Sequence, residues 1–198
     1  MVGMPKRDRK AERREATRQE ILGAAWEIAH ESGLISVTLR EIAARIGMRP
    51  PSLYSHFASK NSIYDAMFAQ AWREFRVVLE REASSFPDDP RGRLLALATT
   101  YFDFAVSDLE RHQLMDMPML RDFTPSEEAY RPAVESYDIM QSVLTEIGIR
   151  HQADLDMYTA IAGGFVNQQL ANDPKGDRWR VLLPRALNLF ADSLGLPA

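Results

Sequence analysis

The polar side chains of residues 49–60 are the best suited in this chain to binding an acidic partner. Nearly all of them are hydrogen-bond donors: Arg49, Ser52, Tyr54 and His56, followed closely by Lys60. Donors that face one way suit a partner rich in acceptors, such as phosphate oxygens and the edges of bases. Leu53 and Phe57 lie four residues apart, so a helix here has one apolar face that would turn inward and leave the donors outside.

Two short helices joined by a tight turn must position these donors, and the sequence predicts them at 38–46 and about 51–57. Thr38 and Glu41 fit a capping box at the start of the first helix. Gly47 follows its last apolar residue, where a left-handed backbone suits a residue without a Cβ atom. Pro50-Pro51 can begin the second helix, because proline lacks only an amide that would be unpaired there. This is a helix-turn-helix pattern, whose second helix can enter the major groove of DNA.

Three pieces of this region resemble the DNA-binding region of the TetR family of transcriptional regulators: TLREIA from Thr38, then Gly47, then SLYSHFASK from Ser52. The Leu-Tyr-x-His-Phe-x-x-Lys run, directly after a capped helix and a glycine turn, is the most specific part. The resemblance implies a C-terminal helical domain in which many relatives bind an inducer and pair with a second chain. It also implies that four side chains face backbone phosphates: Thr38, Tyr54, His56 and Lys60.

Position within the predicted motif separates base contacts from phosphate contacts. Arg49, Pro50 and Ser52 lie at the turn and at the start of the second helix, so we expect them near base edges. Arg49 could bind a guanine through two hydrogen bonds, which contribute roughly 1–3 kcal/mol of discrimination. Arg40 and Arg45 flank the site and add electrostatic attraction to phosphates.

The charge of the chain is divided unevenly along its length. Residues 1–60 hold 11 Lys and Arg against 7 Asp and Glu, a net charge of +4, whereas the remaining residues carry −8 and bring the total to −4. The positive end is where phosphate contacts are predicted, and the acidic remainder disfavours any other face against DNA. A chance asymmetry of this size is the alternative interpretation.

Helical periodicity runs through the chain and no segment reads as a strand, so we predict an all-α protein of about nine helices. Three segments are expected: a flexible basic arm at 1–16, a helix-turn-helix DNA-binding domain at 17–62, and a helical effector-binding and dimerisation domain at 63–198. Ser59 is predicted to cap a long helix at about 60–84, whose continuous apolar stripe would make it a rigid strut between the two domains.

Capping signals set the other helix ends. Thr17 is predicted to begin the first helix as part of a second capping box, and Gly33 to end it. Thr124 is predicted to cap a helix that ends near Gly148, with Pro125 as its first residue. The last two helices are predicted at about 153–171 and 178–194.

Aromatic and methionine side chains in the C-terminal part are more numerous than one helix interface needs. Methionine fills irregular space, and a mostly apolar cavity between helices would bind a small hydrophobic effector. An ordinary packed core accounts for the same residues. The candidate pocket residues are Trp72, Phe75, Tyr101, Phe102, Met115, Met119, Phe123, Tyr137, Met140 and Phe165.

The final two helices are the predicted dimer interface. A lone recognition helix reads only a few base pairs, so symmetric pairing is needed for useful specificity. Gly163-Gly164 inside the first of these helices costs roughly 1 kcal/mol per glycine relative to alanine, which a close helix approach would offset. The candidate interface residues are Phe165, Gln168, Gln169, Leu183, Leu187 and Phe190. The alternative is a kink at the glycines with the leucines in the core of one chain.

Missing residue types and motifs narrow the possible functions. The chain has no cysteine, which excludes disulfides and thiolate metal sites, and no apolar run of the roughly 20 residues that cross a bilayer. It also lacks the apolar stretch of a secretory signal, so we expect a cytoplasmic protein. The 4 histidines never pair at i, i+4, and no hydrolase, P-loop or dinucleotide motif occurs. We therefore predict no enzyme, cofactor or metal site.

These observations favour a homodimeric, sequence-specific regulator of transcription, a repressor that a small, mainly apolar effector releases from a double-stranded DNA operator. Two alternatives stay open. One is a small-molecule-binding or enzymatic helical protein with a vestigial helix-turn-helix. The other is a DNA binder without sequence preference, which would bind with strong salt dependence but would not favour one sequence over another.

Overall fold

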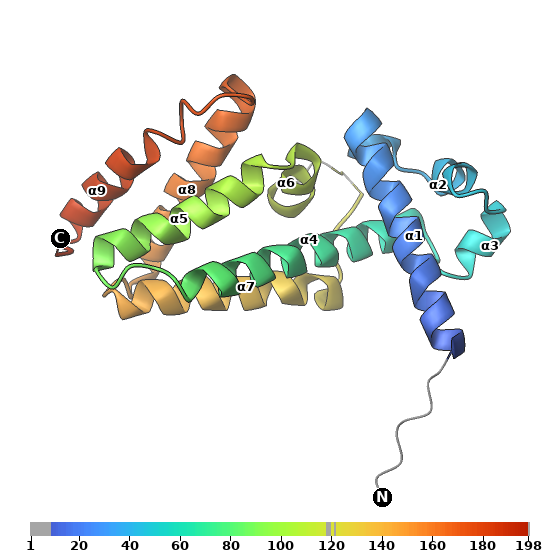
Figure 1. Ribbon diagram of the computed structural model, residues 1–198, viewed down its shortest axis with the longest axis horizontal. Helices are drawn as coiled ribbons and strands as arrows, with labels where there is room; N and C mark the ends of the chain where they lie inside the picture. The colour runs from blue at the N-terminus through green and yellow to red at the C-terminus, as the bar shows by residue number, and fades with distance from the viewer. Residues whose placement is uncertain (1–8, 118–119, 121, 198) are drawn as a thin grey trace, which may run out of the picture.

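A computed structural model of the chain describes residues 9–117, 120 and 122–197. All regular elements within these residues are helical, as the sequence predicts (Figure 1). In chain order they are α1 (Arg9–Ser32), the short 3-10 helix η1 (Leu34–Ser36), α2 (Leu39–Arg45), α3 (Pro50–Tyr54), α4 (Lys60–Ala83), α5 (Pro90–Val106), α6 (Leu109–Asp116), α7 (Glu127–Glu146), α8 (Gln152–Asn172) and α9 (Leu183–Ser193).

Two hydrophobic cores lie along the length of the molecule. The first is formed by α1, α2, α3 and the start of α4, and buries Ile21, Ile42, Leu53, Phe57 and Ile63. The second lies among α4, α5, α7, α8 and α9, at the other end of the ribbon in Figure 1. The short helices α2 and α3 are too short to be stable alone and hold their shape by packing against the first core.

Helix α4 belongs to both cores and connects them. Ser59 caps it in a reciprocal capping box, in which the Ser59 hydroxyl accepts the Ser62 amide at 3.1 Å and the Ser62 hydroxyl accepts the Ser59 amide. Tyr64 and Met67 are buried in the first core, whereas Phe75 and Leu79 are buried in the second. Helix α7 lies alongside α4 (Figure 1). The structure therefore has the long helix between the two cores that the continuous stripe predicts.

The predicted arm at 1–16 is wrong for residues 9–16, which form the first turns of α1; residues 1–8 lie outside the described residues. The segment is rich in Ala, Arg, Glu and Lys, which favour helix. Thr17 therefore lies within α1 and does not cap it: its hydroxyl donates to the Arg13 carbonyl at 3.1 Å. Gly33 follows the helix with φ of 81°, as its predicted role in ending α1 requires.

Three other predicted helix ends are also wrong. Helix α3 spans Pro50–Tyr54, and residues 55 and 56 form a turn, in which the Ser55 and His56 amides donate to the Ser52 and Leu53 carbonyls, three residues before each. Helix α7 is capped by Ser126, two residues later than predicted, since Asp65 of α4 accepts the Ser126 amide at 2.9 Å and holds the chain there. Helix α9 begins at Leu183, because Pro184 lacks the amide that a helix running through it would need.

No described helix combines the length and the apolar character that crossing a bilayer requires.

Candidate nucleic-acid interface and effector cavity

The turn between α2 and α3 has the geometry of the predicted motif. Thr38 is extended at the N-cap of α2, and its hydroxyl oxygen accepts the Glu41 amide at 3.1 Å. The hydroxyl hydrogen of this exposed residue stays available to an acceptor such as a phosphate oxygen. Gly47 has φ of 64°, a backbone conformation that a side chain would strain. Arg49 is the N-cap of α3, with Pro50 as the first helical residue.

Helix α3 faces solvent with its polar side. Leu53 and Phe57 are buried beneath it, so the opposite side points outward. Tyr54 is 54% exposed, so its ring and hydroxyl are open to a partner. Exposed with it are Arg49, Pro50 and Ser52, and Arg40 is exposed on α2. With Thr38 at the N-cap of α2, six of the eight predicted DNA contacts therefore lie on an open surface of α2 and α3.

Two arginines of α1, which the sequence analysis missed, hold the end of α3. Arg14 Nη2 donates to the Ser55 carbonyl at 3.2 Å, and Arg18 Nη1 donates to the His56 carbonyl at 2.5 Å. The Arg18 guanidinium also lies 4.1 Å from the centroid of the Phe57 ring. These contacts satisfy carbonyls that the short helix leaves without partners. The two arginines lie four residues apart, which would have placed them on one face of a helix. Because Arg14 fell within the predicted flexible arm, the sequence analysis did not consider them together.

His56 and Lys60 are less accessible than the other predicted contacts. The side chain of His56 is partly buried, and its Nδ1 atom has no hydrogen-bond partner among the described residues. Lys60 Nζ donates to the Ile35 carbonyl at 3.1 Å and lies 5.1 Å from the ring centroid of Tyr64. Partial burial lowers the pKa of Lys60 below its usual value. In this structure Lys60 ties the start of α4 to η1.

Arg45, which the sequence analysis expects to add positive charge, is neutralised within the chain. Its guanidinium donates to both carboxylate oxygens of Glu31 at 2.9 and 2.6 Å and lies 3.6 Å from Glu27. The hydrogen bond from Arg45 lowers the pKa of Glu31. Arg40 and Arg49 have no ion-pair partner among the described residues, so they are the cations of this surface that are open to phosphates or bases.

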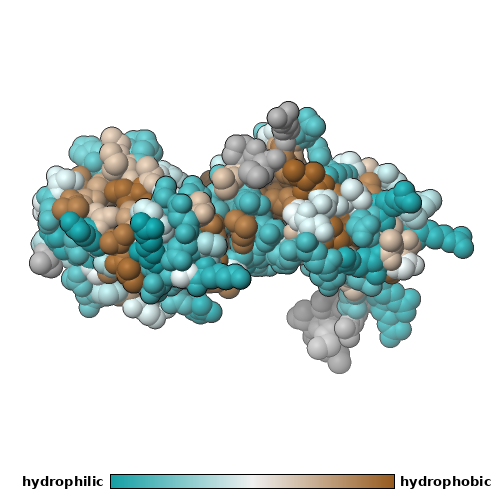
Figure 2. Space-filling model, turned by 90° about the horizontal axis from the view of Figure 1, so that it is seen from above, coloured by the Kyte–Doolittle hydropathy of each residue, from teal (hydrophilic) through white to brown (hydrophobic). Residues whose placement is uncertain are grey.

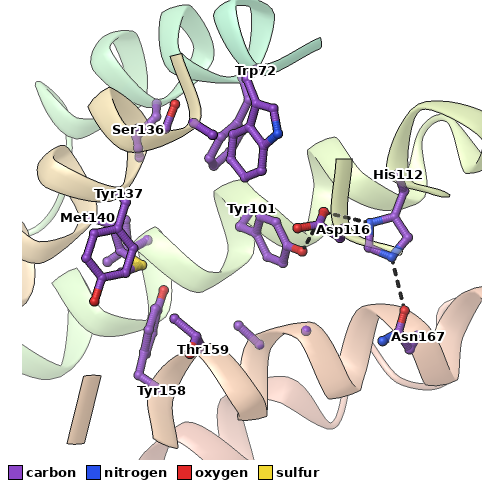
Figure 3. A pocket seen from close by; sticks show the side chains of 16 residues that line it. Trp72, Tyr101, His112, Asp116, Ser136, Tyr137, Met140, Tyr158, Thr159 and Asn167 are labelled. Atoms are coloured by element: carbon purple, nitrogen blue, oxygen red, sulfur yellow. Dashed lines mark hydrogen bonds and ion pairs between the residues drawn. The ribbon is translucent and has the colours of Figure 1, made fainter. Parts of the chain in front are cut away.

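A cavity of about 360 Å³ lies in the second core, between α4, α5, α6, α7 and α8. Five of the ten predicted pocket residues line it: Trp72, Phe75, Tyr101, Tyr137 and Met140. Figure 3 shows Trp72, Tyr101 and Tyr137 with Tyr158 around the open space. Apolar walls also come from Leu79 and Leu97. The volume falls within the roughly 300–1,000 Å³ of pockets that bind drug-sized ligands.

The other predicted pocket residues do not line this cavity. Phe102 is buried in the packed core, and Met115 and Phe123 lie at a separate hollow of about 290 Å³ beside Phe68 and Leu114. Phe165 packs edge-on against Trp179, with ring centroids 6.0 Å apart. Met119 lies outside the described residues. Hydrophobic type alone did not separate the lining of a cavity from a packed core.

One end of the cavity is polar, and the sequence analysis missed it. Tyr101 donates its hydroxyl hydrogen to Asp116 Oδ2 at 3.1 Å, and His112 Nδ1 lies 3.1 Å from the same oxygen, at ion-pair distance but without hydrogen-bond geometry. His112 Nε2 is 3.0 Å from Asn167 Oδ1 (Figure 3). The i, i+4 spacing of His112 and Asp116 was visible in the sequence, but no signal connected it with Tyr101 or Asn167.

Burial and pairing shift the titration of this group. Burial alone lowers the pKa of His112, but its contacts with Asp116 and Asn167 outweigh burial and raise that pKa above its usual value. Burial, and secondly the charge of Asp116, raises the pKa of Tyr101 well above its usual value. Burial also raises the pKa of Tyr158. Both phenols are therefore neutral donors at neutral pH, and the contacts of His112 stabilise its protonated form relative to a free imidazole.

The α8–α9 end differs from the predicted interface in its residues. Leu183, Leu187 and Phe190 are buried within the chain, so the alternative of an intrachain core holds for them. Gln169 is also buried, where its side chain bonds the Gly176 carbonyl and the Trp179 amide. Large apolar side chains are nevertheless exposed on and beside these helices: Met157, Val181, Leu182 and Leu189. Figure 2 shows apolar surface on the left-hand lobe, which contains this end of the molecule.

A separate polar cluster joins the two halves of the molecule. His30 of α1 lies 3.0 Å from Asp108 of α6, and the ligand atoms of these two residues and Glu110 all lie within 4.8 Å of one another. Asp108 also caps α6 by accepting the Arg111 amide. The cap and the acidic first turn of α6 account for both carboxylates without a metal.

Comparisons with known proteins agree with this geometry. The family model described as bacterial regulatory proteins of the tetR family matches residues 21–67. The HTH-type transcriptional activator FasR of Mycolicibacterium smegmatis is 34% identical over 102 residues, which cover 52% of this chain but only 46% of that protein. The chain thus spans about half the length of this relative.

Solved structures share the fold over nearly the whole chain. A tetR-family regulatory protein from Rhodococcus RHA1 superposes with a TM-score of 0.64 at 20% identity, over 91% of this chain and 98% of that one. The regulator FadR from Bacillus subtilis, solved in complex with stearoyl-CoA, has a TM-score of 0.67 at 19% identity, over 87% of this chain and 96% of that one. Residues 21–67, which hold the motif, thus match the tetR family of bacterial regulatory proteins, and the chain shares its fold with these solved structures.

Proposed function

We propose that this protein is a sequence-specific, DNA-binding regulator of transcription that works as a homodimer and is released from its operator by a small, mainly apolar effector. The observation that carries the proposal is the exposed polar side of α3, held outward by the buried Leu53 and Phe57. A helix presented in this way fits the major groove of DNA. Repression is the sense of regulation that we propose, since effector-driven release then switches the gene on.

The proposed contacts follow the exposure of each side chain. Arg49 and Ser52 at the start of α3 are proposed to contact base edges, with Pro50 packing against them. Thr38 and Tyr54 are proposed to bind phosphates, and Arg40 to add electrostatic attraction. We propose that His56 and Lys60 act mainly by fixing the position of α3 and α4, because His56 Nδ1 is buried and Lys60 Nζ already donates to the Ile35 carbonyl.

A second copy of the chain is proposed to pack on α8 and α9. One α3 helix reads too few base pairs for useful specificity, whereas two related by a twofold axis read a palindrome. Val181 and Leu189 are 61% and 63% exposed, which supports a self-complementary apolar patch at this end. The exposed Gly164 has no heavy atom of another element within 4 Å of the site of a Cβ, which leaves room for a close partner.

The cavity supports the proposed effector site. Helix α4 forms one wall with Trp72 and Phe75 and begins directly after the DNA-binding motif. An effector that prefers one position of α4 would therefore bias the separation of two α3 helices in a dimer, provided that its affinity differs between the two arrangements. The FadR structure holds stearoyl-CoA, an acyl thioester, which supports a small-molecule effector here in general terms.

We further propose a cytoplasmic protein without catalytic activity, divided near residue 62 into a DNA-binding and an effector-binding part. The lack of cysteine suits a reducing compartment. The family match covers a DNA-binding module, and the cavity residues have roles in packing and in the polar network that need no reaction.

Selection of bound sequences from a random DNA pool tests the proposed function. We expect a palindrome whose half-sites lie about one helical turn apart or slightly more. The selected duplex and a scrambled one are then titrated at two salt concentrations. Strong preference for the selected duplex supports the proposal. Salt-sensitive binding without preference would show a nonspecific DNA binder, and no binding would favour a vestigial motif.

A further inference from the structure

The cavity is lined by aromatic rings and has an anionic group at its polar end. Trp72, Phe75, Tyr101, Tyr137 and Tyr158 all line it. Trp72 and Phe75 meet edge to face with centroids 6.0 Å apart, and Phe75 and Tyr101 do the same at 5.7 Å. Edge-to-face packing of neighbouring rings leaves ring faces available to a third group. Figure 3 shows Trp72, Tyr101, Tyr137 and Tyr158 arranged around one open space.

Asp116 is the carboxylate of this cavity, and only one of its oxygens is engaged. Oδ2 accepts the Tyr101 hydroxyl and faces His112, whereas Oδ1 has no hydrogen-bond or ion-pair partner among the described residues. The side chain is 28% exposed, so the carboxylate is reachable from the cavity and from solvent. An ionised carboxylate accepts hydrogen bonds and attracts cations but offers no donor to an anion.

The charges around the cavity favour a positive ligand over a negative one. No lysine or arginine is among the described residues that line it, and the one basic group, His112, is already paired with Asp116. A carboxylate or phosphate would enter without a free cation to bind it. Faces of tryptophan and tyrosine rings attract cations through their quadrupole, most strongly where water is excluded.

Resting on the effector site proposed above, we propose that this cavity binds a lipophilic organic cation. Its charged nitrogen lies beside Asp116 Oδ1 and among the aromatic rings, and its apolar part packs against Leu79, Leu97 and Met140. A preference for cations would distinguish this cavity from that of FadR, which was solved with stearoyl-CoA. The phosphates of such a ligand would find no lysine or arginine among the described residues that line this cavity.

His112 makes the affinity of the cavity for charged ligands depend on pH, in a direction that can be measured. The His112 ring faces Asp116 from its own helix and the neutral Asn167 from α8, and Tyr101 from α5 donates to the same Asp116 oxygen. A bound cation repels protonated His112, so proton and cation compete for the charge of Asp116. Affinity for a cation therefore rises with pH as His112 loses its proton, affinity for an anion falls, and affinity for a neutral molecule stays level.

Three probes of one chain length test the proposal by calorimetric titration of the full-length protein: decyltrimethylammonium, decanol and decanoate. We expect the ammonium to bind at least about tenfold more tightly than either of the others at neutral pH. Its affinity should rise several-fold between about pH 6 and pH 9. The proposal would be overturned if the protein bound decanoate or decanol more tightly than the ammonium, or all three with equal affinity. It would also be overturned if the ammonium did not bind at millimolar concentration.

The variant Asp116→Asn keeps the shape of the side chain and removes its charge. It should weaken the ammonium about tenfold or more and leave decanol unchanged. Asp138→Asn, the same change on the exposed side of α7 and outside the cavity, is the matched control and should change neither. If the Asp116 variant also loses decanol binding, Asp116 maintains the shape of the cavity and does not select ligands by charge, which would overturn the proposal. Operator binding without effector is measured in parallel, so failure here leaves the DNA-binding function separately tested.

Discussion

Removing the guanidinium of Arg18 tests how α1 holds the short helix α3. Its hydrogen bond to the His56 carbonyl is a charged one, which contributes about 1.5–3 kcal/mol, and its contact with the Phe57 ring contributes about 0.5–1 kcal/mol where partly exposed. Methionine keeps the apolar stem and part of its packing. We therefore expect Arg18→Met to lower the free energy of unfolding by about 2 kcal/mol.

Urea denaturation followed by circular dichroism measures this difference without DNA, so a direct contact of Arg18 with phosphate does not affect the result. Arg13→Met is the matched control, because Arg13 is exposed on the same helix and its side chain has no hydrogen-bond or ion-pair partner among the described residues. Its effect should stay within about 0.5 kcal/mol. If the two variants lose the same stability, the arginine contacts do not hold α3 in place, and the argument for a fixed α3 fails.

Three further predictions concern the interface, the buried imidazole and base recognition. Leu189→Glu, at a 63% exposed position, should shift the protein to monomers in sedimentation equilibrium, whereas Val77→Glu, at a 58% exposed position on α4, should not; a persistent dimer would exclude this face. His112→Gln should lower the melting temperature more at about pH 6 than at about pH 9. Because the pKa of His112 is raised, protonated His112 stabilises the fold at pH values below the ordinary pKa of 6.5, and this contribution is lost as pH rises through the folded-state pKa. An equal difference at both pH values would contradict the pairing with Asp116. Arg49→Ala should relax the selected DNA motif at one symmetric base position and leave the rest; equal losses on every sequence would show that Arg49 does not read bases.

The fold was predictable where local signals and packing agree. Gly33, Gly47 and Ser59 end or begin helices as their chemistry predicts, because each has a conformation or a hydrogen bond that few other residues supply. Thr17 and Thr124 carry the same signals without acting as caps. In α1 the preceding residues are good helix formers and extend the helix, and before α7 the contact of Asp65 with Ser126 decides the start. Tertiary contacts of this kind are invisible in a local pattern.

The candidate sites were predictable to different degrees. The DNA-facing residues lie within one motif, so spacing alone gathers Arg49, Ser52 and Tyr54 on one side. The cavity is assembled from five helices, and hydrophobic type cannot tell that Tyr101 lines it while Phe102, its neighbour in sequence, is packed in the core. The polar end was missed because His112 and Asp116 meet their partners only through tertiary packing.

Binding of the selected operator by two tyrosine variants tests the central claim, that the exposed side of α3 contacts DNA. Tyr54 on α3 and Tyr130 on α7 are 54% and 51% exposed, so they are matched in exposure, but only Tyr54 lies on the proposed DNA-binding surface. Loss of a hydrogen bond to a charged phosphate predicts that Tyr54→Ala weakens binding about tenfold or more, while Tyr130→Ala binds as the unchanged protein does. Equal affinity of the two variants for the operator would contradict the account.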